Sequence, residues 1–158
     1  GMERKQMEAL ILDEYSAMYR LAFTYVKNEA DAMDVVQDSV VKAMTRCGDI
    51  RKKDAAKSWL LSTVAHCALD LLRQNKRRTD AEIPERGEDD RYSNIDLEQA
   101  MRLLKENEYL ILVLHYFEDQ TLREIADALD MRESTVKSTL YRALKKLRVH
   151  MEEGVDRA

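Results

Sequence analysis

Apolar residues recur along most of the chain at the three- and four-residue spacing of an amphipathic helix, and alternating, strand-like runs are few. One proline and four glycines interrupt the 158 residues. The pattern therefore predicts an all-α fold. In the first half it predicts helices over residues 2–27, 29–46 and 54–78, the second capped by Asn28, with a loop at 47–53. The buried stripe of the first helix is expected to hold Tyr15, Tyr19, Ala22 and Val26.

The pattern changes between residues 79 and 94, where TDAEIPERGEDDRYSN is polar, acidic and contains the single proline. Such a composition is typical of a flexible linker. We therefore predict two small helical domains, residues 2–78 and 95–151, joined by this linker. The second domain is expected to hold helices over 96–105, 108–117, 122–129 and 134–150. The helix over 108–117 should be its core, because residues 109–114 are apolar on every side.

The last two predicted helices, separated by a short turn at Asp130, are typical of a helix-turn-helix motif. Thr121 and Glu124 form a capping box at the start of the first helix. The second helix has apolar residues on one stripe, and its other side carries cations, hydroxyls and an aromatic ring: Ser134, Lys137, Ser138, Tyr141 and Lys145, with Arg142 at the margin. Such a helix suits the major groove of DNA. The alternative is the solvated basic face of an ordinary surface helix.

Charge is segregated along the chain, although the net charge is only -4. Residues 51–80 hold eight Lys and Arg against three Asp, a local +5, and residues 131–150 hold six against one Glu, again +5. Residues 81–130 hold five basic and fourteen acidic residues, a local -9. Two basic segments on an acidic background indicate two separate contacts with a polyanion.

An enzyme is not expected, because the sequence has no glycine-rich phosphate loop and no nucleophile and base at usable spacing. No cofactor or metal is predicted either, since His66 and Cys67 diverge on a helix and no second pair exists. Cys47 and Cys67 are expected to be reduced thiols. With no secretory signal and no apolar run of membrane-spanning length, we predict a cytoplasmic protein without membrane insertion.

Three segments resemble the extracytoplasmic-function (ECF) group of bacterial RNA polymerase sigma factors. They are YRLAFTYVKNEADAMDVVQDSVVKAM at 19–44, KSWLLSTVAHCALDLLRQNKRR at 57–78 and LVLHYFEDQTLREIADALDMRESTVKSTLYRALKKLR at 112–148. They cover more than half of the chain in the order of the family. The resemblance implies a protein that binds core RNA polymerase, directs it to specific promoters and starts DNA-templated transcription. It also implies an anti-sigma factor as a further partner.

The resemblance assigns roles to residues that spacing alone leaves open. On the helix over 29–46 it implies docking on core polymerase, with candidates Asp31, Asp34, Gln37 and Asp38; without it, this is a solvated acidic face. The first domain would melt the -10 promoter element, with candidates Arg51, Lys52, Lys53, His66, Arg73, Lys76 and Arg77. The helix-turn-helix would bind the -35 element, with candidates Ser134, Lys137, Ser138, Tyr141, Arg142 and Lys145.

The sequence departs from the family pattern at a few positions. Cys67 stands where the family often has Asn, and Asp130 stands in the turn where Gly is frequent. Asp tolerates the left-handed conformation better than most residues, so the turn is expected to survive. Arg132 replaces a common helix-capping Ser or Pro, and the usual proline near Lys105 is missing.

Two other functions are compatible with the pattern. A helix-turn-helix transcriptional regulator would bind duplex DNA as a dimer, without polymerase. An all-helical adaptor would not bind DNA at all, and the loss of Lys137 and Arg142 would then change nothing.

Overall fold

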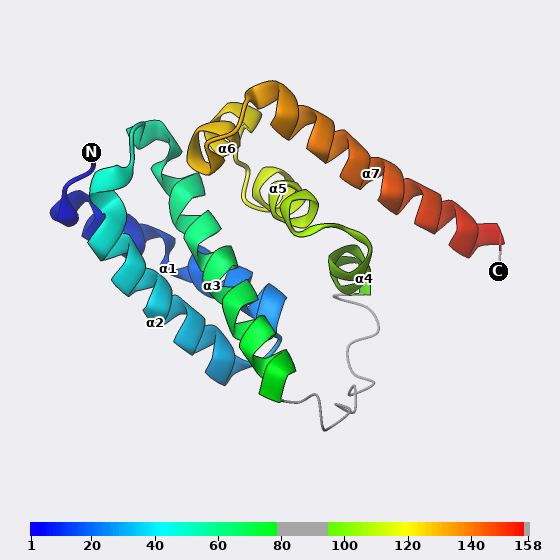
Figure 1. Ribbon diagram of the computed structural model, residues 1–158, viewed down its shortest axis with the longest axis horizontal. Helices are drawn as coiled ribbons and strands as arrows, with labels where there is room; N and C mark the ends of the chain where they lie inside the picture. The colour runs from blue at the N-terminus through cyan, green and yellow to red at the C-terminus, as the bar shows by residue number, and fades with distance from the viewer. Residues whose placement is uncertain (79–94, 157–158) are drawn as a thin grey trace. The chain divides into compact units, whose positions relative to one another are not determined.

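The computed structural model describes residues 1–78 and 95–156, which are helical throughout apart from turns, and no strand occurs in these ranges (Figure 1). The chain divides into two compact units, Gly1–Arg86 and Gly87–Ala158, and each is described by itself. The predicted linker, residues 79–94, lies outside the described residues. The prediction of an all-α fold is confirmed.

The first unit is a bundle of three helices, α1 (Arg4–Val26), α2 (Glu29–Arg46) and α3 (Ala56–Arg78), each packed on the other two. A sharp turn joins α1 to α2. Lys27 ends α1 in the left-handed conformation (φ 64°), and its N–H donates to the Phe23 carbonyl at 2.8 Å. Asn28 caps α2 as predicted, because its side chain accepts from the Asp31 N–H at 2.9 Å.

The core of this unit is mainly apolar, and the buried Ser39 and Ser62 hydroxyls donate to carbonyls of their own helices. Its largest buried side chains are Met7, Met18, Leu21, Val35, Val36, Leu60, Leu61 and Val64. Ala22 and Val26 are buried as predicted, but Tyr15 is 41% exposed and Tyr19 is half-buried, so the prediction for Tyr15 is wrong. The apolar surface of α1 is too wide for one face. The helix therefore leaves Leu12 and Tyr15 at the surface, while Tyr25 is buried.

The segment between α2 and α3 is built from two short 3-10 turns, Cys47–Asp49 and Lys53–Ala55. Cys47 and Ile50 are buried and anchor it, and the Ile50 N–H donates to the Cys47 carbonyl at 3.2 Å. The second turn delays α3, which begins at Ala56 and not at 54. The polar residues of the segment are thereby held at the surface by two apolar anchors.

The second unit contains α4 (Ile95–Leu103), α5 (Glu106–Tyr116), α6 (Leu122–Leu129) and α7 (Glu133–Asp156). Residues 109–114 of α5 are all buried, so this helix is the core as predicted. Helix α7 packs on α5 and α6 through Val136, Leu140 and Ala143. It continues six residues beyond the predicted end at 150.

Local hydrogen bonds fix the turn between α6 and α7. The Glu124 N–H donates to the Thr121 hydroxyl at 3.0 Å, and the Thr121 N–H donates to the Glu124 carboxylate at 2.9 Å, which confirms the capping box. Asp130 has left-handed backbone angles (φ 54°, ψ 48°), and the Met131 N–H donates to the Ala126 carbonyl at 2.9 Å. The helix-turn-helix thus closes with aspartate at the position that favours glycine.

Candidate nucleic-acid and protein interfaces

The outer side of α7 presents every residue predicted for the -35 element. Ser134, Lys137, Ser138, Tyr141, Arg142 and Lys145 are all exposed. Three of them contact neighbours on the helix: the Lys137 ammonium lies 5.9 Å from the centroid of the Tyr141 ring, and the Ser138 hydroxyl donates to the Thr135 carbonyl at 3.1 Å. Because the opposite side of the helix is buried against α5 and α6, this face can enter a groove without loss of packing.

Arg142 contacts two residues, Thr139 and Glu108, that the sequence analysis did not single out. Its Nη2 donates to the Thr139 hydroxyl at 3.1 Å, and that buried hydroxyl donates to the Thr135 carbonyl at 2.7 Å. Its Nε lies 3.9 Å from Oε2 of Glu108 on α5. The Arg142 side chain is still 60% exposed. Its guanidinium therefore has two internal neighbours and an accessible outer edge.

Glu108 is a buried carboxylate at the contact between α5 and α7, with 3% of its side chain exposed. Its Oε1 accepts from the Lys146 ammonium at 2.7 Å and from the Lys105 N–H at 2.9 Å. Burial by itself would raise the pKa of Glu108. The two hydrogen bonds and the attraction of both lysines outweigh burial and hold the pKa below its ordinary value.

This lowered pKa predicts an acid-sensitive second unit. A carboxyl whose pKa is lower in the folded than in the unfolded state stabilises the fold at neutral pH, and the contribution is lost as pH falls through the folded value. We expect the Glu108→Gln variant to lose about 1–3 kcal/mol of unfolding free energy at pH 7. At a pH below the lowered folded value, where the carboxyl is protonated in both states, the difference from wild type should shrink. Urea unfolding of the full chain at both pH values, followed through NMR peaks of α5 and α7, measures this. A pH-independent difference would contradict it.

The basic residues of the first unit lie at the two ends of α3 (green in Figure 1). Arg51, Lys52 and Lys53 are exposed in the segment before the helix, and Arg73, Lys76 and Arg77 are exposed in its last turns. His66 is exposed between them. With a rise of about 1.5 Å per residue, the two ends are about 30 Å apart. The structure thus presents two separate basic clusters, one just before α3 and one in its last turns.

The acidic side of α2 divides into two parts. Asp34, Gln37 and Asp38 are exposed. Asp31 is half-buried, and its Oδ2 accepts from the amides of Asn28 at 2.9 Å and Asn75 at 3.3 Å. Asp31 therefore ties the start of α2 to α3.

Apolar side chains continue the exposed part of this face. Met33 is 37% exposed and Val41 is 66% exposed, and both lie four residues from Gln37 on the same side of α2. The exposed face of α2 is thus a mixed surface of two carboxylates, one amide and two apolar side chains. We call Met33, Asp34, Gln37, Asp38 and Val41 the α2 face.

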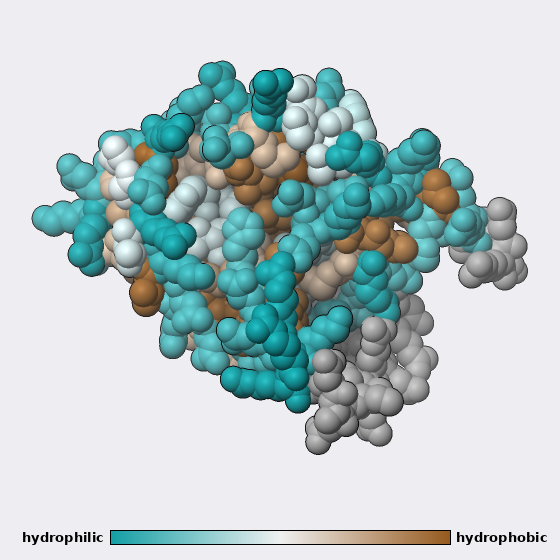
Figure 2. Space-filling model, in the orientation of Figure 1, coloured by the Kyte–Doolittle hydropathy of each residue, from teal (hydrophilic) through white to brown (hydrophobic). Residues whose placement is uncertain are grey.

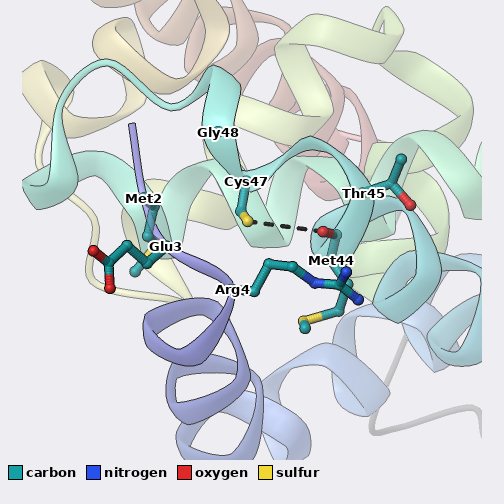
Figure 3. A pocket seen from close by; sticks show the side chains of 7 residues that line it. All are labelled: Met2, Glu3, Arg4, Met44, Thr45, Cys47 and Gly48. Carbon is teal, nitrogen blue, oxygen red and sulfur yellow. Dashed lines mark hydrogen bonds between the residues drawn. The ribbon is translucent and has the colours of Figure 1, made fainter.

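A hollow of about 520 Å³ lies where α1 begins and α2 ends (Figure 3). In it the Cys47 thiol lies 3.8 Å from the Met44 carbonyl. It is lined by Met2, Glu3, Arg4, Met44, Thr45, Cys47 and Gly48. None of these lining residues is a predicted site residue. The part of the chain that the structure describes holds no group of three or more His, Cys, Asp or Glu able to bind a metal.

The surface drawn in Figure 2 is mostly hydrophilic, with apolar side chains in several small areas. None of the described helices is long and apolar enough to cross a membrane.

Comparison with known proteins decides the family. Residues 10–78 match the family model "Sigma-70 region 2", and residues 95–147 match "Sigma-70, region 4". The RNA polymerase sigma factor SigV of Bacillus subtilis is 38% identical over an alignment of 160 positions, which covers 95% of this chain and 96% of SigV. The chain is an RNA polymerase sigma factor of the ECF group. Sigma factors are regulatory proteins and not enzymes.

Other relatives agree with this family. The ECF sigma factor SigX of Bacillus subtilis is 24% identical over 90% of this sigma factor and 82% of SigX. Among solved structures, the sigma factor RpoE of Bartonella quintana, in complex with the anti-sigma factor NepR, matches with a TM-score of 0.67. Its identity is 17%, and the match covers 94% of this chain and 98% of that one. CnrH, in complex with the cytosolic domain of CnrY, matches with a TM-score of 0.64 at 19% identity over 96% and 90% of the two chains. These two structures share the fold.

Proposed function

We propose that the sigma factor binds the -35 promoter element through the outer side of α7. The observation that carries this proposal is the exposure of all six predicted residues on a helix whose other side is buried. Lys137 and Arg142 contact bases, because long cationic side chains can donate to the guanine edge in the major groove. The hydroxyls of Ser134, Ser138 and Tyr141 and the ammonium of Lys145 contact phosphates and fix the register.

The first unit melts the -10 element with the two basic clusters at the ends of α3. Arg51, Lys52 and Lys53 hold the backbone of the unpaired strand beside a captured base, whose extrusion costs a few kcal/mol. Arg73, Lys76 and Arg77 contact phosphates of the adjoining duplex, and His66 lies between the clusters. The separation of about 30 Å spans roughly nine nucleotides at 3.4 Å each, enough for one cluster on each side of a melting boundary.

The α2 face docks on core polymerase. Asp34 and Asp38 supply charge, Gln37 supplies hydrogen bonds, and Met33 and Val41 supply apolar contact, a combination typical of a protein interface. Asp31 supports this face from within through Asn28 and Asn75. The domains would be residues 2–78 for polymerase and -10 contacts and 95–151 for the -35 contact, with 79–94 as linker.

The sigma factor also binds an anti-sigma factor, acts in the cytoplasm where core polymerase is found, and has no catalytic activity or cofactor of its own. The proposal for the inhibitor is supported by the two solved relatives, RpoE and CnrH, which are in complex with NepR and CnrY.

Gel-shift assays with a promoter fragment from upstream of its own gene, with and without purified core polymerase, test this function. We expect specific binding only in the presence of core polymerase. Specific binding by the isolated chain at the same affinity, unchanged by core polymerase, would favour the helix-turn-helix regulator.

A further inference from the structure

The contact between α5 and α7 contains a charge that the -35 contacts proposed above do not use. Glu108 is almost fully buried, and a buried carboxylate is costly unless it is paired and hydrogen-bonded. Its partners on α7 are Arg142 and Lys146, which lie four residues apart and so face the same way. Both cations sit at the margin between the buried and the exposed sides of α7. Glu108 therefore acts on the margin of the proposed DNA-binding face.

Glu108 and Thr139 together define the orientation of the Arg142 guanidinium. Nε faces the carboxylate at 3.9 Å and Nη2 donates to the Thr139 hydroxyl at 3.1 Å, so two edges of a planar group have neighbours before DNA binds. Recognition of a guanine by arginine requires a defined plane, because the two donors must meet two acceptors. Orientation before binding also reduces the entropy lost on binding.

Glu108 has the opposite effect on Lys146: it keeps this cation from contacting DNA. Its ammonium donates to Glu108 at 2.7 Å, although 41% of its side chain is exposed. Turning this ammonium toward a phosphate would leave Glu108 with one partner fewer in a buried place, which is unfavourable. The carboxylate thus withholds a cation that would otherwise add sequence-independent attraction to DNA.

We infer that Glu108 is a positioning residue for promoter recognition: it fixes the guanidinium of Arg142 for base contact and keeps Lys146 away from phosphates. The inference rests on the proposed function of α7. It adds a determinant of specificity that touches no DNA, 34 residues before Arg142 in the chain. It predicts that loss of the Glu108 charge weakens discrimination between promoter sequences more than it weakens binding.

The test uses full-length protein with core polymerase. The probes are a duplex selected by the wild-type holoenzyme from a pool with a randomised upstream element, and a scrambled version of it. Affinity for both is measured over a range of salt concentrations for wild type, Glu108→Gln, Arg142→Ala and the double variant. Glutamine keeps the shape of Glu108 and can still accept from the Lys105 N–H. Glu152→Gln, an exposed position on α7, controls for the change in net charge.

We expect Glu108→Gln to lower the selected-to-scrambled affinity ratio about five- to tenfold, within the range for one base contact. Binding to the scrambled duplex should become more salt-dependent, with the slope of log affinity against log salt steeper by up to about one as Lys146 is released. In the Arg142→Ala background, Glu108→Gln should not lower the ratio further, because the two residues act through one contact. A general loss of stability would weaken both probes alike without changing the slope.

Three results would overturn the inference. Glu108→Gln could keep the wild-type ratio, or it could lower the ratio equally with and without Arg142. In both cases a low ratio for Arg142→Ala alone would leave the proposed DNA contact standing. If Arg142→Ala itself keeps the wild-type ratio, the proposed base contact fails, and the positioning role fails with it.

Discussion

Replacing Lys137 and Arg142 with alanine is expected to abolish initiation at promoters that depend on an upstream element. Each base contact in the major groove contributes about 1–3 kcal/mol, so the double variant should lose at least about thirtyfold in affinity for the selected duplex. Both side chains are exposed on α7, and Lys146 still pairs with the buried Glu108 when Arg142 is replaced, so the chain should still fold. The measurement is run-off transcription with core polymerase, alongside circular dichroism to confirm folding.

The matched control removes the same charge elsewhere. Lys5 on α1 and Arg102 on α4 are exposed and lie outside α7. Their double alanine variant should initiate as wild type does. Equal losses in the two double variants would mean that net charge, and not the face of α7, determines promoter binding.

Reversing the charge of the α2 face is expected to separate the sigma factor from core polymerase. Asp34→Lys with Asp38→Lys replaces two exposed carboxylates by cations, and we expect the affinity for core polymerase to fall by at least about thirtyfold, or about 2 kcal/mol. Helix α2 should stay folded, because its buried residues and its Asn28 cap are unchanged. Competition with a labelled wild-type sigma factor for purified core polymerase measures the effect.

The control for the Asp34→Lys and Asp38→Lys variant is a double variant on α1. Glu8→Lys with Asp13→Lys makes the same change in net charge at exposed positions. This variant should compete for core polymerase as wild type does. If both pairs weaken association equally, long-range charge explains the effect, and the α2 face is not a docking surface.

The helix-turn-helix could be predicted in detail because its determinants are local. The capping box of Thr121 and Glu124 and the left-handed turn at Asp130 involve residues three or four apart, and both occur in the structure. The exposed side of α7 followed from helical spacing in the same way. Where a signal is contained within one turn of helix, the sequence is sufficient.

Features that join distant segments could not be predicted. Glu108 and Lys146 are 38 residues apart, and nothing near either residue indicates the pair. Asp31 looked like its neighbours Asp34 and Asp38, but its bond with Asn75 crosses 44 residues to α3. The prediction that Tyr15 is buried was wrong for a related reason. Which part of a wide apolar surface is buried depends on how α2 and α3 approach α1. These properties belong to the packing of helices and not to any one of them.

Run-off transcription with purified bacterial core polymerase tests the central claim most directly. The template is the promoter upstream of the sigma factor's own gene, and core polymerase alone is the reference. We predict a discrete new start site that requires the sigma factor and disappears when Lys137 and Arg142 are both alanine. A sigma factor that binds core polymerase but produces the same start site with or without these two side chains would contradict promoter recognition by α7.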